Sequence, residues 1–373
     1  MAPAVGPPPT MGPSSRIIAP GVAMPTIAMG TPHSSVPVCC GGGGRAVNES
    51  CCDAAMEKAA LQWWATGGVA VETSLAYGTG VGLGHALVRS GRARGSVFLH
   101  GKVQCRSTVA EVEALVAAHL AEVGVESFDL LTIHYPNGAT GGIPSCGGGN
   151  LSATWAAFER VRAAGRARAI GTSDFSVAWL DRLVSFGGGR SQPAYNQIRM
   201  GVGGSDAQLD DVLKFCRAHN ITVGGFSSLS HGCMSKPLVS TIAASHNRSA
   251  AQVCLRWVSQ LGCNVVVSSS RAEYDRSDLG SLDFDLTAAE MASLSALRGA
   301  PQSTSAHRLL SWRTWYQRKR NPAGGRARLS DTGPSPSPSP PPGPAAGTAN
   351  GGEQAQFDEF GCPITRGSHS CDV

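Results

Sequence analysis

The sequence predicts an α/β protein, a (β/α)8 TIM barrel with disordered N- and C-terminal extensions. Eight short apolar runs alternate with longer amphipathic segments through the middle of the chain, as eight strand–helix pairs would. Many of the 47 Gly and 23 Pro gather towards the two ends of the 373-residue chain. We therefore expect the barrel to span residues 16–300, with a disordered extension at 1–15 and a Pro/Ser/Gly-rich, mostly disordered tail at 301–373.

The expected strands are the runs at 26–30, 69–73, 97–102, 129–134, 169–173, 194–197, 222–226 and 264–268. The expected helices are 53–66, 80–91, 108–123, 151–165, 176–185, 206–219, 248–261 and 287–297. In TVAEVEALVAAHLAEV (108–123), apolar residues recur at three- and four-residue spacing, which is typical of an amphipathic helix. Thr287 with Glu290 three residues later predicts a capping box at the last helix.

The main competing fold is an open, doubly wound sheet. Such a sheet usually carries a nucleotide-binding signature at its first strand–helix turn, and none follows the run at 26–30. Two later glycine-rich patterns fail their spacing. In GTGVGLGH (78–85), His85 stands where a third glycine is needed. In GSVFLHGK (95–102), the glycines are too far apart for a phosphate loop, and Val103 replaces Ser or Thr. The barrel is the better prediction.

Composition excludes several classes of partner. A net charge of +5 is a mild bias, and the basic run at 313–328 is best interpreted as a solvated stretch, so we expect no nucleic-acid partner. We find no apolar segment of 18 residues and no secretory leader, so we expect no membrane partner and a cytoplasmic location with the 12 Cys reduced. The vicinal Cys pairs lack a recognised zinc spacing, so we expect no metal.

Polar residues end three consecutive predicted strands. Glu72 and Tyr77 lie in VAVETSLAYG, Lys102 lies in VFLHGKV and His134 lies in LLTIHYP. Each alone has a structural explanation, such as a solvated lysine or a hydrogen-bonded core histidine. Catalytic side chains in such barrels come from the carboxyl ends of several strands, so together these four form a candidate active site.

These segments resemble, in order, motifs of the aldo-keto reductase family. VETSLAYG is similar to the family's I-D-T-A-x-x-Y-G, FLHGKV to its strand ending in T-K, and DLLTIHYP to D-L-x-x-I-H-x-P. The likeness continues through AIGTSDFS, PAYNQI, GGFSSLSHG, AAQVCLRWVSQLG and LDFDLTAAEM, and upstream in VAMPTIAMGT. It covers about residues 16–300.

The resemblance implies an NADP-dependent oxidoreductase that reduces aldehydes or ketones to alcohols by hydride transfer. Tyr77 would be the general acid, Lys102 would lower the pKa of its phenol, and His134 would orient the substrate oxygen. Glu72 would pair with Lys102 where the family has aspartate. The alternative is a catalytically weak or inactive barrel that binds the cofactor as a sensor or scaffold.

The resemblance also implies a cofactor site for NADP(H), with NAD(H) as the open alternative. Gly30 and Thr31 form the turn after the first strand, Ser173, Asp174 and Gln197 would meet the carboxamide, Phe226 would stack on the ring, and Ser227 and Leu229 would line the pyrophosphate. The family's 2′-phosphate motif maps to Ser268, Ser269, Tyr274 and Asp278, with Arg271 and Arg276 as substitute cations. A small carbonyl substrate, a monomer and a substrate loop at 137–149 complete the prediction.

Overall fold

The computed structural model describes residues 15–31, 49–136, 150–186, 191–205, 208–230, 232–269 and 271–298. The predicted tail at 301–373, the glycine-rich stretch at 137–149 and residues 1–14 lie outside the described residues. Ser15, assigned from the sequence to the N-terminal extension, begins a strand instead.

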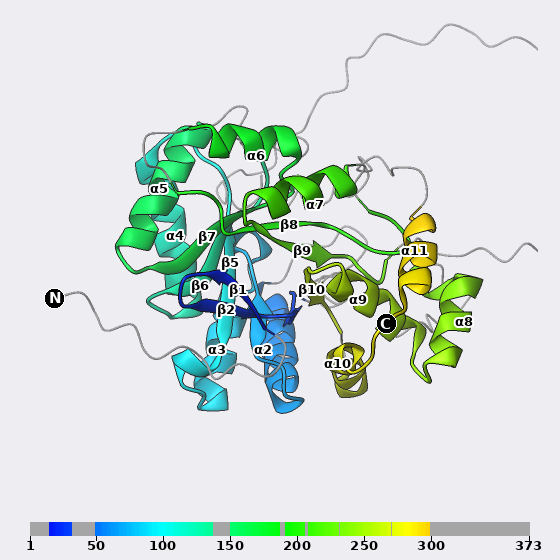
Figure 1. The fold of residues 1–373 in the computed structure, drawn as a ribbon. Helices are drawn as coiled ribbons and strands as arrows, with labels where there is room; N and C mark the ends of the chain where they lie inside the picture. Colours follow the sequence, from blue (N-terminus) through cyan, green and yellow to red (C-terminus); the bar gives the residue numbers. More distant parts are fainter. Residues whose placement is uncertain are drawn as a thin grey trace, which may run out of the picture.

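Eight parallel strands close into a barrel, which confirms the predicted fold (Figure 1). Around the barrel, β10 pairs with β3, and each further strand pairs with the next in the sequence until β9 returns to β10. The strands are β3 (Ile27–Met29), β4 (Ala70–Glu72), β5 (Phe98–Val103), β6 (Phe128–Ile133), β7 (Ala167–Ser173), β8 (Tyr195–Arg199), β9 (Thr222–Phe226) and β10 (Asn264–Val267). They are the eight expected runs, and parallel pairing sends all their carboxyl ends to one end of the barrel.

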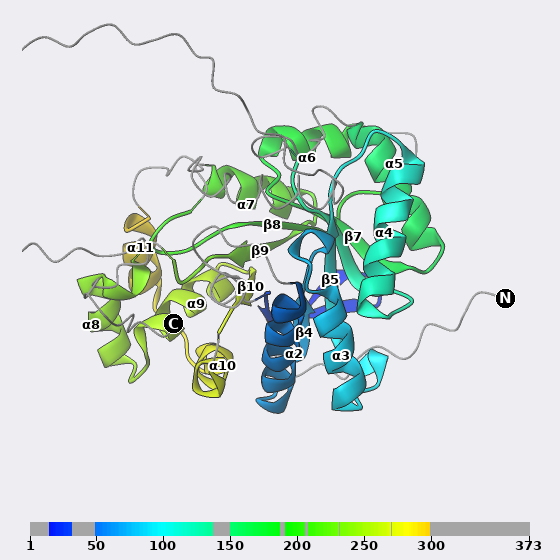
Figure 2. The same ribbon diagram turned by 180° about the vertical axis from the view of Figure 1, so that it is seen from behind.

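Helices surround the barrel (Figure 2). Those that match the prediction are α2 (Glu49–Ala65), α3 (Gly80–Ser90), α4 (Val109–Val123), α5 (Leu151–Ala163), α6 (Val177–Val184), α7 (Leu209–Ala218), α9 (Ala250–Gln260) and α11 (Ala288–Ala296). The capping box of Thr287 and Glu290 is present, as is a second one at Thr108. The sequence interpretation missed two short helices, α8 (Pro237–Ser245) and α10 (Ala272–Leu279).

An antiparallel hairpin of β1 (Ser15–Ala19) and β2 (Val22–Pro25) precedes the barrel and was not predicted. Its buried Ile18, Val22 and Met24 pack on residues at the beginnings of the strands, among them Phe98 and Leu130. The hairpin therefore covers the amino-terminal end of the barrel with an apolar contact, and it leaves the opposite end to the loops that follow the strands.

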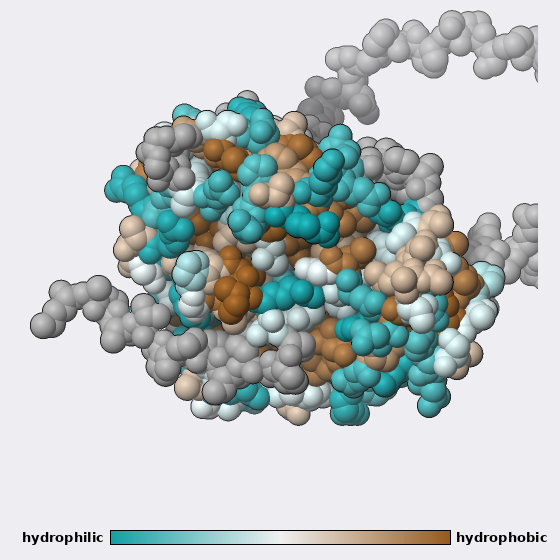
Figure 3. All heavy atoms as spheres, viewed as in Figure 1, coloured by the Kyte–Doolittle hydropathy of each residue, from teal (hydrophilic) through white to brown (hydrophobic). Residues whose placement is uncertain are grey.

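A second and larger apolar core fills the layer between strands and helices. Its largest fully buried side chains include Trp63, Trp155 and Trp257. Their indole nitrogens are satisfied, since each donates a hydrogen bond, for example from Trp63 to the Ala70 carbonyl at 2.9 Å. On the face shown in Figure 3, hydrophilic and hydrophobic residues are interspersed over the outer helices. No helix in the described part of the chain is long and apolar enough to cross a membrane.

The cysteines differ from the expectation that all are reduced. Cys52 and Cys105 are disulfide-bonded, whereas Cys216, Cys233, Cys254 and Cys263 are free and buried. Composition predicted the opposite for the first two because it gives no information on which sulfur atoms the fold brings together.

Candidate active site

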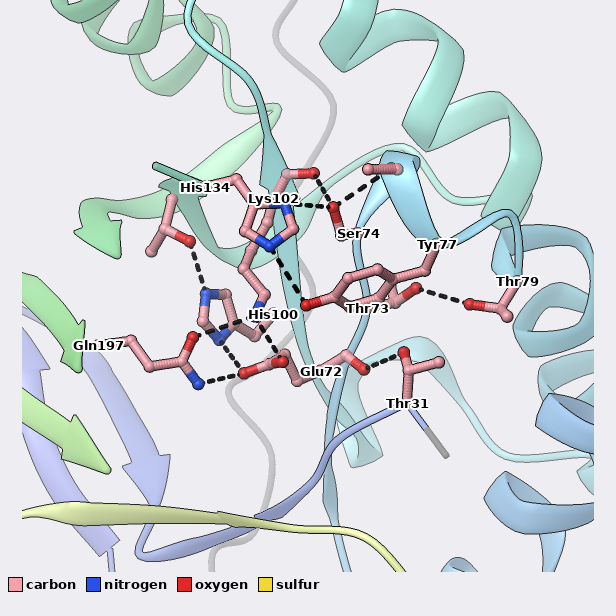
Figure 4. A network of polar contacts seen from close by, with 12 residues as sticks. Thr31, Glu72, Thr73, Ser74, Tyr77, Thr79, His100, Lys102, His134 and Gln197 are labelled. Atoms are coloured by element: carbon pink, nitrogen blue, oxygen red, sulfur yellow. Dashed lines mark hydrogen bonds and ion pairs between the residues drawn. The ribbon is translucent and has the colours of Figure 1, made fainter. Parts of the chain in front are cut away.

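The four candidate catalytic residues meet at the carboxyl end of the barrel (Figure 4). Glu72 ends β4, Lys102 lies near the end of β5, and His134 follows β6 directly. Tyr77 ends a short 3-10 helix, η1 (Leu75–Tyr77), which begins at the Ser74 N-cap and closes with Gly78 in the left-handed region at φ 64°. This tight turn returns the phenol over the end of β5.

Glu72 and Lys102 form a buried ion pair, with 2.6 Å between Nζ and Oε1. Each side chain is only 5% exposed, so water contributes little to solvating either charge. Burial alone would raise the pKa of Glu72. The ammonium of Lys102 and the hydrogen bonds from Lys102 and Gln197 lower this pKa by more than burial raises it, so the net shift is downward. Glu72 is therefore an anion at neutral pH, as the role proposed for it requires.

Tyr77 and His134 are hydrogen-bonded, with 3.2 Å between Oη and Nε2. The Nζ atom of Lys102 lies 5.4 Å from the centroid of the Tyr77 ring. The expected lowering of the phenol pKa is not found. Burial, followed by the carboxylates of Glu72 and Asp174, raises the pKa of Tyr77 well above its ordinary value. The sequence argument gave the wrong direction because it considered the charge of Lys102 and could not see how deeply the phenol is buried or that Glu72 and Asp174 lie near it.

Ser74 fixes the tautomer of His134, and the sequence interpretation had not singled it out. Its hydroxyl donates to the Lys102 carbonyl at 3.1 Å, and its oxygen lies 3.0 Å from His134 Nδ1. Because the single hydroxyl proton points to the carbonyl, Nδ1 must be the donor in the second contact. Nε2 is then unprotonated and accepts from the phenol of Tyr77. In this arrangement His134 orients Tyr77 and has no Nε2 proton to offer a substrate.

Two more buried polar residues extend the network into the barrel. His100 precedes Lys102 by two residues on β5, and its Nε2 lies 2.9 Å from Thr132 Oγ1 on β6. Its Nδ1 lies 3.7 Å from Glu72 Oε2. Neither residue stands out in the sequence, because each is a single polar residue inside an apolar strand.

Gln197 on β8 bonds to the ion pair through both ends of its amide. Its Nε2 donates to Glu72 Oε2, and its Oε1 accepts from Lys102 Nζ at 3.1 Å. The residue expected to read the nicotinamide carboxamide is thus hydrogen-bonded within the protein. Ser173, at the end of β7, is buried, and the next residue, Asp174, has a left-handed backbone at φ 58°. Asp174 therefore turns the chain at the edge of the site.

The ends of β3 and β9 supply the other predicted cofactor residues. Thr31 is buried and donates to the Glu72 carbonyl at 3.3 Å, and a Cβ on Gly30 would lie 2.8 Å from Val266 Cγ1. Phe226 ends β9 and is partly buried, as are Ser227 and Leu229 in the turn that follows. These positions lie at the same end of the barrel as the ion pair.

Ser228, between Ser227 and Leu229, was missed by the sequence analysis. It is 2% exposed, and its Oγ has no hydrogen-bond partner among the described residues. A Cβ on the nearby Gly201 would lie 2.8 Å from the Ser228 carbonyl oxygen, so only glycine allows this close approach.

The predicted phosphate site lies between β10 and α10 and is mixed in charge. Ser268 is exposed, and Ser269 is buried and donates to Asp275. Burial, followed by the neighbouring Asp275, raises the pKa of Asp278 to about 7. The guanidinium of Arg271 lies 5.6 Å from the Tyr274 ring centroid. All six predicted residues, exposed Arg276 included, lie on α10 or in the turn before it, with the carboxyl groups of Asp275 and Asp278 buried.

No cluster of three or more potential metal ligands occurs among the described residues. The side chains gathered at this end of the barrel are a phenol, an imidazole and an ammonium–carboxylate pair, which can move a proton.

Comparison with known proteins gives one consistent family. The model of the Aldo/keto reductase family matches residues 65–298. An aldo-keto reductase of Mycolicibacterium vanbaalenii is 32% identical over 247 residues, which cover 66% of this chain and 84% of that protein. These matches confirm the resemblance seen in the sequence motifs.

Solved structures agree. An aldo/keto reductase from Brucella melitensis superposes with a TM-score of 0.64 at 25% identity, covering 76% of this chain and 98% of that one. The Bombyx mori aldo-keto reductase in complex with NADP gives a TM-score of 0.66 at 19% identity, covering 80% and 97%. At that identity, the second match supports the barrel fold alone.

Proposed function

Because the chain belongs to the aldo/keto reductase family, a family of oxidoreductases, we propose that it reduces an aldehyde or a ketone to the alcohol with NADP(H) as hydride source. The observation that carries this proposal is the contact of Tyr77 with His134 beside the buried pair of Glu72 and Lys102. A carbonyl oxygen that accepts a hydride on its carbon becomes an alkoxide and needs a proton from a positioned acid.

Tyr77 supplies that proton in the proposed mechanism. With its pKa raised, the phenol is protonated at neutral pH and can donate. His134 Nε2 accepts the phenol hydrogen bond in the resting site and so aims Oη. A substrate oxygen near Oη then competes for the same proton, which passes to the alkoxide as charge develops there.

Lys102 stabilises the phenolate left on Tyr77. Its ammonium lies 5.4 Å from the ring centroid, on the side of the site where that negative charge would develop. In a buried site, a fixed charge of this kind acts more strongly than in water. Glu72 holds the ammonium in place, and Gln197 bridges both groups.

The cofactor supplies a hydride when bound. We propose that residues at the carboxyl ends of β7 to β10, and in the turns that follow, hold it. Ser173 and Asp174 would meet the carboxamide, Phe226 would lie on the ring, and the turn at 227–229 would meet the pyrophosphate. Arg271 and Arg276 would provide the charge for a 2′-phosphate, which favours NADP(H). The buried acidic side chains of Asp275 and Asp278 would disfavour a 2′-phosphate and so favour NAD(H). The experiment below therefore compares NADH with NADPH.

A sensor or scaffold that binds cofactor without turnover is the second candidate. It is favoured by Gln197, whose amide is already bonded at both ends to the ion pair, and by the raised pKa of Tyr77. Cellular location and oligomeric state stay predictions from the sequence.

The test uses the full-length chain with NADPH and NADH in parallel against aromatic and aliphatic aldehydes and ketones. We expect reduced-nicotinamide absorbance to fall with equimolar alcohol formation, and with a lower KM for NADPH. Saturable binding of either nucleotide, without alcohol formation from any carbonyl, would contradict the proposed reductase function and favour the sensor or scaffold. Equal KM values for NADPH and NADH would contradict the proposal that Arg271 and Arg276 bind a 2′-phosphate.

A further inference from the structure

We propose that His100 is a positioning residue of this site: its imidazole fixes the carboxylate of Glu72 and, through it, the ammonium of Lys102 beside Tyr77. The consequence for turnover rests on the reductase activity proposed above. The position of His100, two residues before Lys102 on β5, places both side chains on the same side of the strand.

The geometry encloses the imidazole on three sides. His100 is fully buried, with Nε2 2.9 Å from Thr132 Oγ1 and Nδ1 3.7 Å from Glu72 Oε2 (Figure 4). The ring of Tyr195 meets it edge-on, with centroids 5.7 Å apart at 84°. Packing of this kind leaves the ring few other orientations, so its Nδ1 stays directed at Glu72.

The imidazole acts through its N–H and not through charge. Burial lowers the pKa of His100 to about 3, so the ring is neutral at physiological pH. The Thr132 hydroxyl can donate to Nε2, which leaves the ring proton on Nδ1, facing the carboxylate. Nδ1 has no hydrogen-bond partner within 3.5 Å in the described part of the chain, and this N–H faces the Glu72 carboxylate at 3.7 Å as a dipole next to a charge.

Glu72 needs this additional restraint because of its length. A glutamate has one more rotatable bond than an aspartate and loses more conformational entropy when it is fixed. Lys102 holds Oε1, while Gln197 and His100 lie on Oε2. Removing the imidazole would open space beside Oε2, which would keep only its hydrogen bond from Gln197, and Lys102 would follow the carboxylate away from Tyr77.

The first experiment compares three substitutions of His100. Asparagine places a nitrogen close to the Nδ1 position, glutamine places one close to the Nε2 position, and leucine removes both. We expect kcat for carbonyl reduction to fall on the order of 10- to 100-fold in His100→Leu and His100→Gln, the loss that a displaced catalytic group causes. His100→Asn should recover most of kcat, because it keeps the donor towards Glu72.

A matched control is available in His119. It is also fully buried, on α4 against Phe128, and neither ring nitrogen has a hydrogen-bond partner among the described residues. His119→Leu should leave kcat unchanged. An equal loss of kcat in His119→Leu and His100→Leu, or unchanged kcat in a folded His100→Leu, would overturn the proposal.

A second readout does not depend on activity. The lysines of the chain are Lys58, Lys102, Lys214, Lys236 and Lys319, so the Nζ resonance of Lys102 can be assigned in ¹⁵N-lysine-labelled protein by loss of its signal in Lys102→Met. We expect that resonance to shift in His100→Leu, to stay near wild type in His100→Asn, and to be unmoved in His119→Leu.

The two readouts separate the two proposals. A wild-type chain without reductase activity in which His100→Leu still moves the Lys102 resonance would refute the proposed function and keep the positioning role. An active wild-type chain in which neither kcat nor the resonance responds to His100→Leu would refute the positioning role and keep the function.

Discussion

The two ends of the barrel each contain a buried carboxylate in an ion pair, Asp129 with two arginines and Glu72 with one lysine. At the amino-terminal end, Asp129 on β6 is 2% exposed and bonds to Arg94 and Arg168 at 2.8 Å each, while the Leu99 N–H donates to it. Arg168 in turn donates to the Gly21 carbonyl of the hairpin. All of these partners of Asp129 hold strands and the hairpin together.

At the carboxyl end, Glu72 is equally buried, yet its partner Lys102 lies beside the phenol of Tyr77. The difference shows that burial and pairing alone do not identify a catalytic charge. Under the proposed function, the pair of Glu72 and Lys102 differs by the proton donor and acceptor next to it, at the end of the barrel where the loops follow the strands. The predictions below test this division.

The largest effect is expected for Lys102→Met. It removes the cation beside Tyr77 and leaves Glu72 buried without it, so both turnover and stability should fall, the latter by about 3 to 5 kcal/mol. The double variant Glu72→Gln with Lys102→Met should recover stability in urea unfolding and remain inactive. Recovery of activity in the double variant would contradict a catalytic role for the pair.

Asp129→Ala should lower stability by about 3 kcal/mol, because two arginines and the Leu99 N–H lose their acceptor. Its kcat at a temperature where it is folded should equal that of the wild type. Urea unfolding and steady-state kinetics on the same preparation check both statements. A selective loss of kcat would erase the distinction between the two ends.

Asp278→Asn should change how stability depends on pH. Folded Asp278 keeps its proton up to about pH 7, whereas an unfolded aspartate loses it near pH 4. Between these values the unfolded state binds fewer protons, so wild-type stability falls as pH rises. Asparagine should remove that slope and add about 4 kcal/mol at pH 8, since the shift is about three pKa units. Exposed Asp283→Asn is the control and should leave the slope in place.

Ser74→Ala should have the smallest effect. It removes the acceptor for His134 Nδ1 and the bond to the Lys102 carbonyl, a loss of about 1 kcal/mol and roughly 5-fold in kcat. Ser74→Thr keeps the hydroxyl and should retain activity. Steady-state kinetics at saturating nucleotide compare kcat of the two variants. Equal kcat values in Ser74→Ala and Ser74→Thr would contradict a role for the Ser74 hydroxyl in the site.

The sequence predicts more of the fold than of the site. Alternating strands and helices are local patterns, so all eight barrel strands were found. The β1–β2 hairpin, α8 and α10 were missed because they are short and their burial depends on distant residues. Tyr77, Lys102 and His134 stand out as polar strand ends. His100, Ser74 and Ser228 do not.

The protonation and hydrogen bonding of the site were harder to predict than the residues that form it. The direction of the shift in the Tyr77 pKa depends on how deeply the phenol is buried and on the nearby carboxylates of Glu72 and Asp174, which only coordinates give. The bonds of Gln197 to that pair join β8 to β4 and β5, and no local pattern reports them.

The central claim is that Tyr77 gives the proton in carbonyl reduction. The direct measurement is the single-turnover rate of NADPH oxidation by wild type and Tyr77→Phe with the best aldehyde of the panel, with thermal unfolding of both as the folding control. The account predicts a loss on the order of 10²- to 10⁴-fold with unchanged unfolding temperature. An undiminished rate in a folded Tyr77→Phe variant would contradict it.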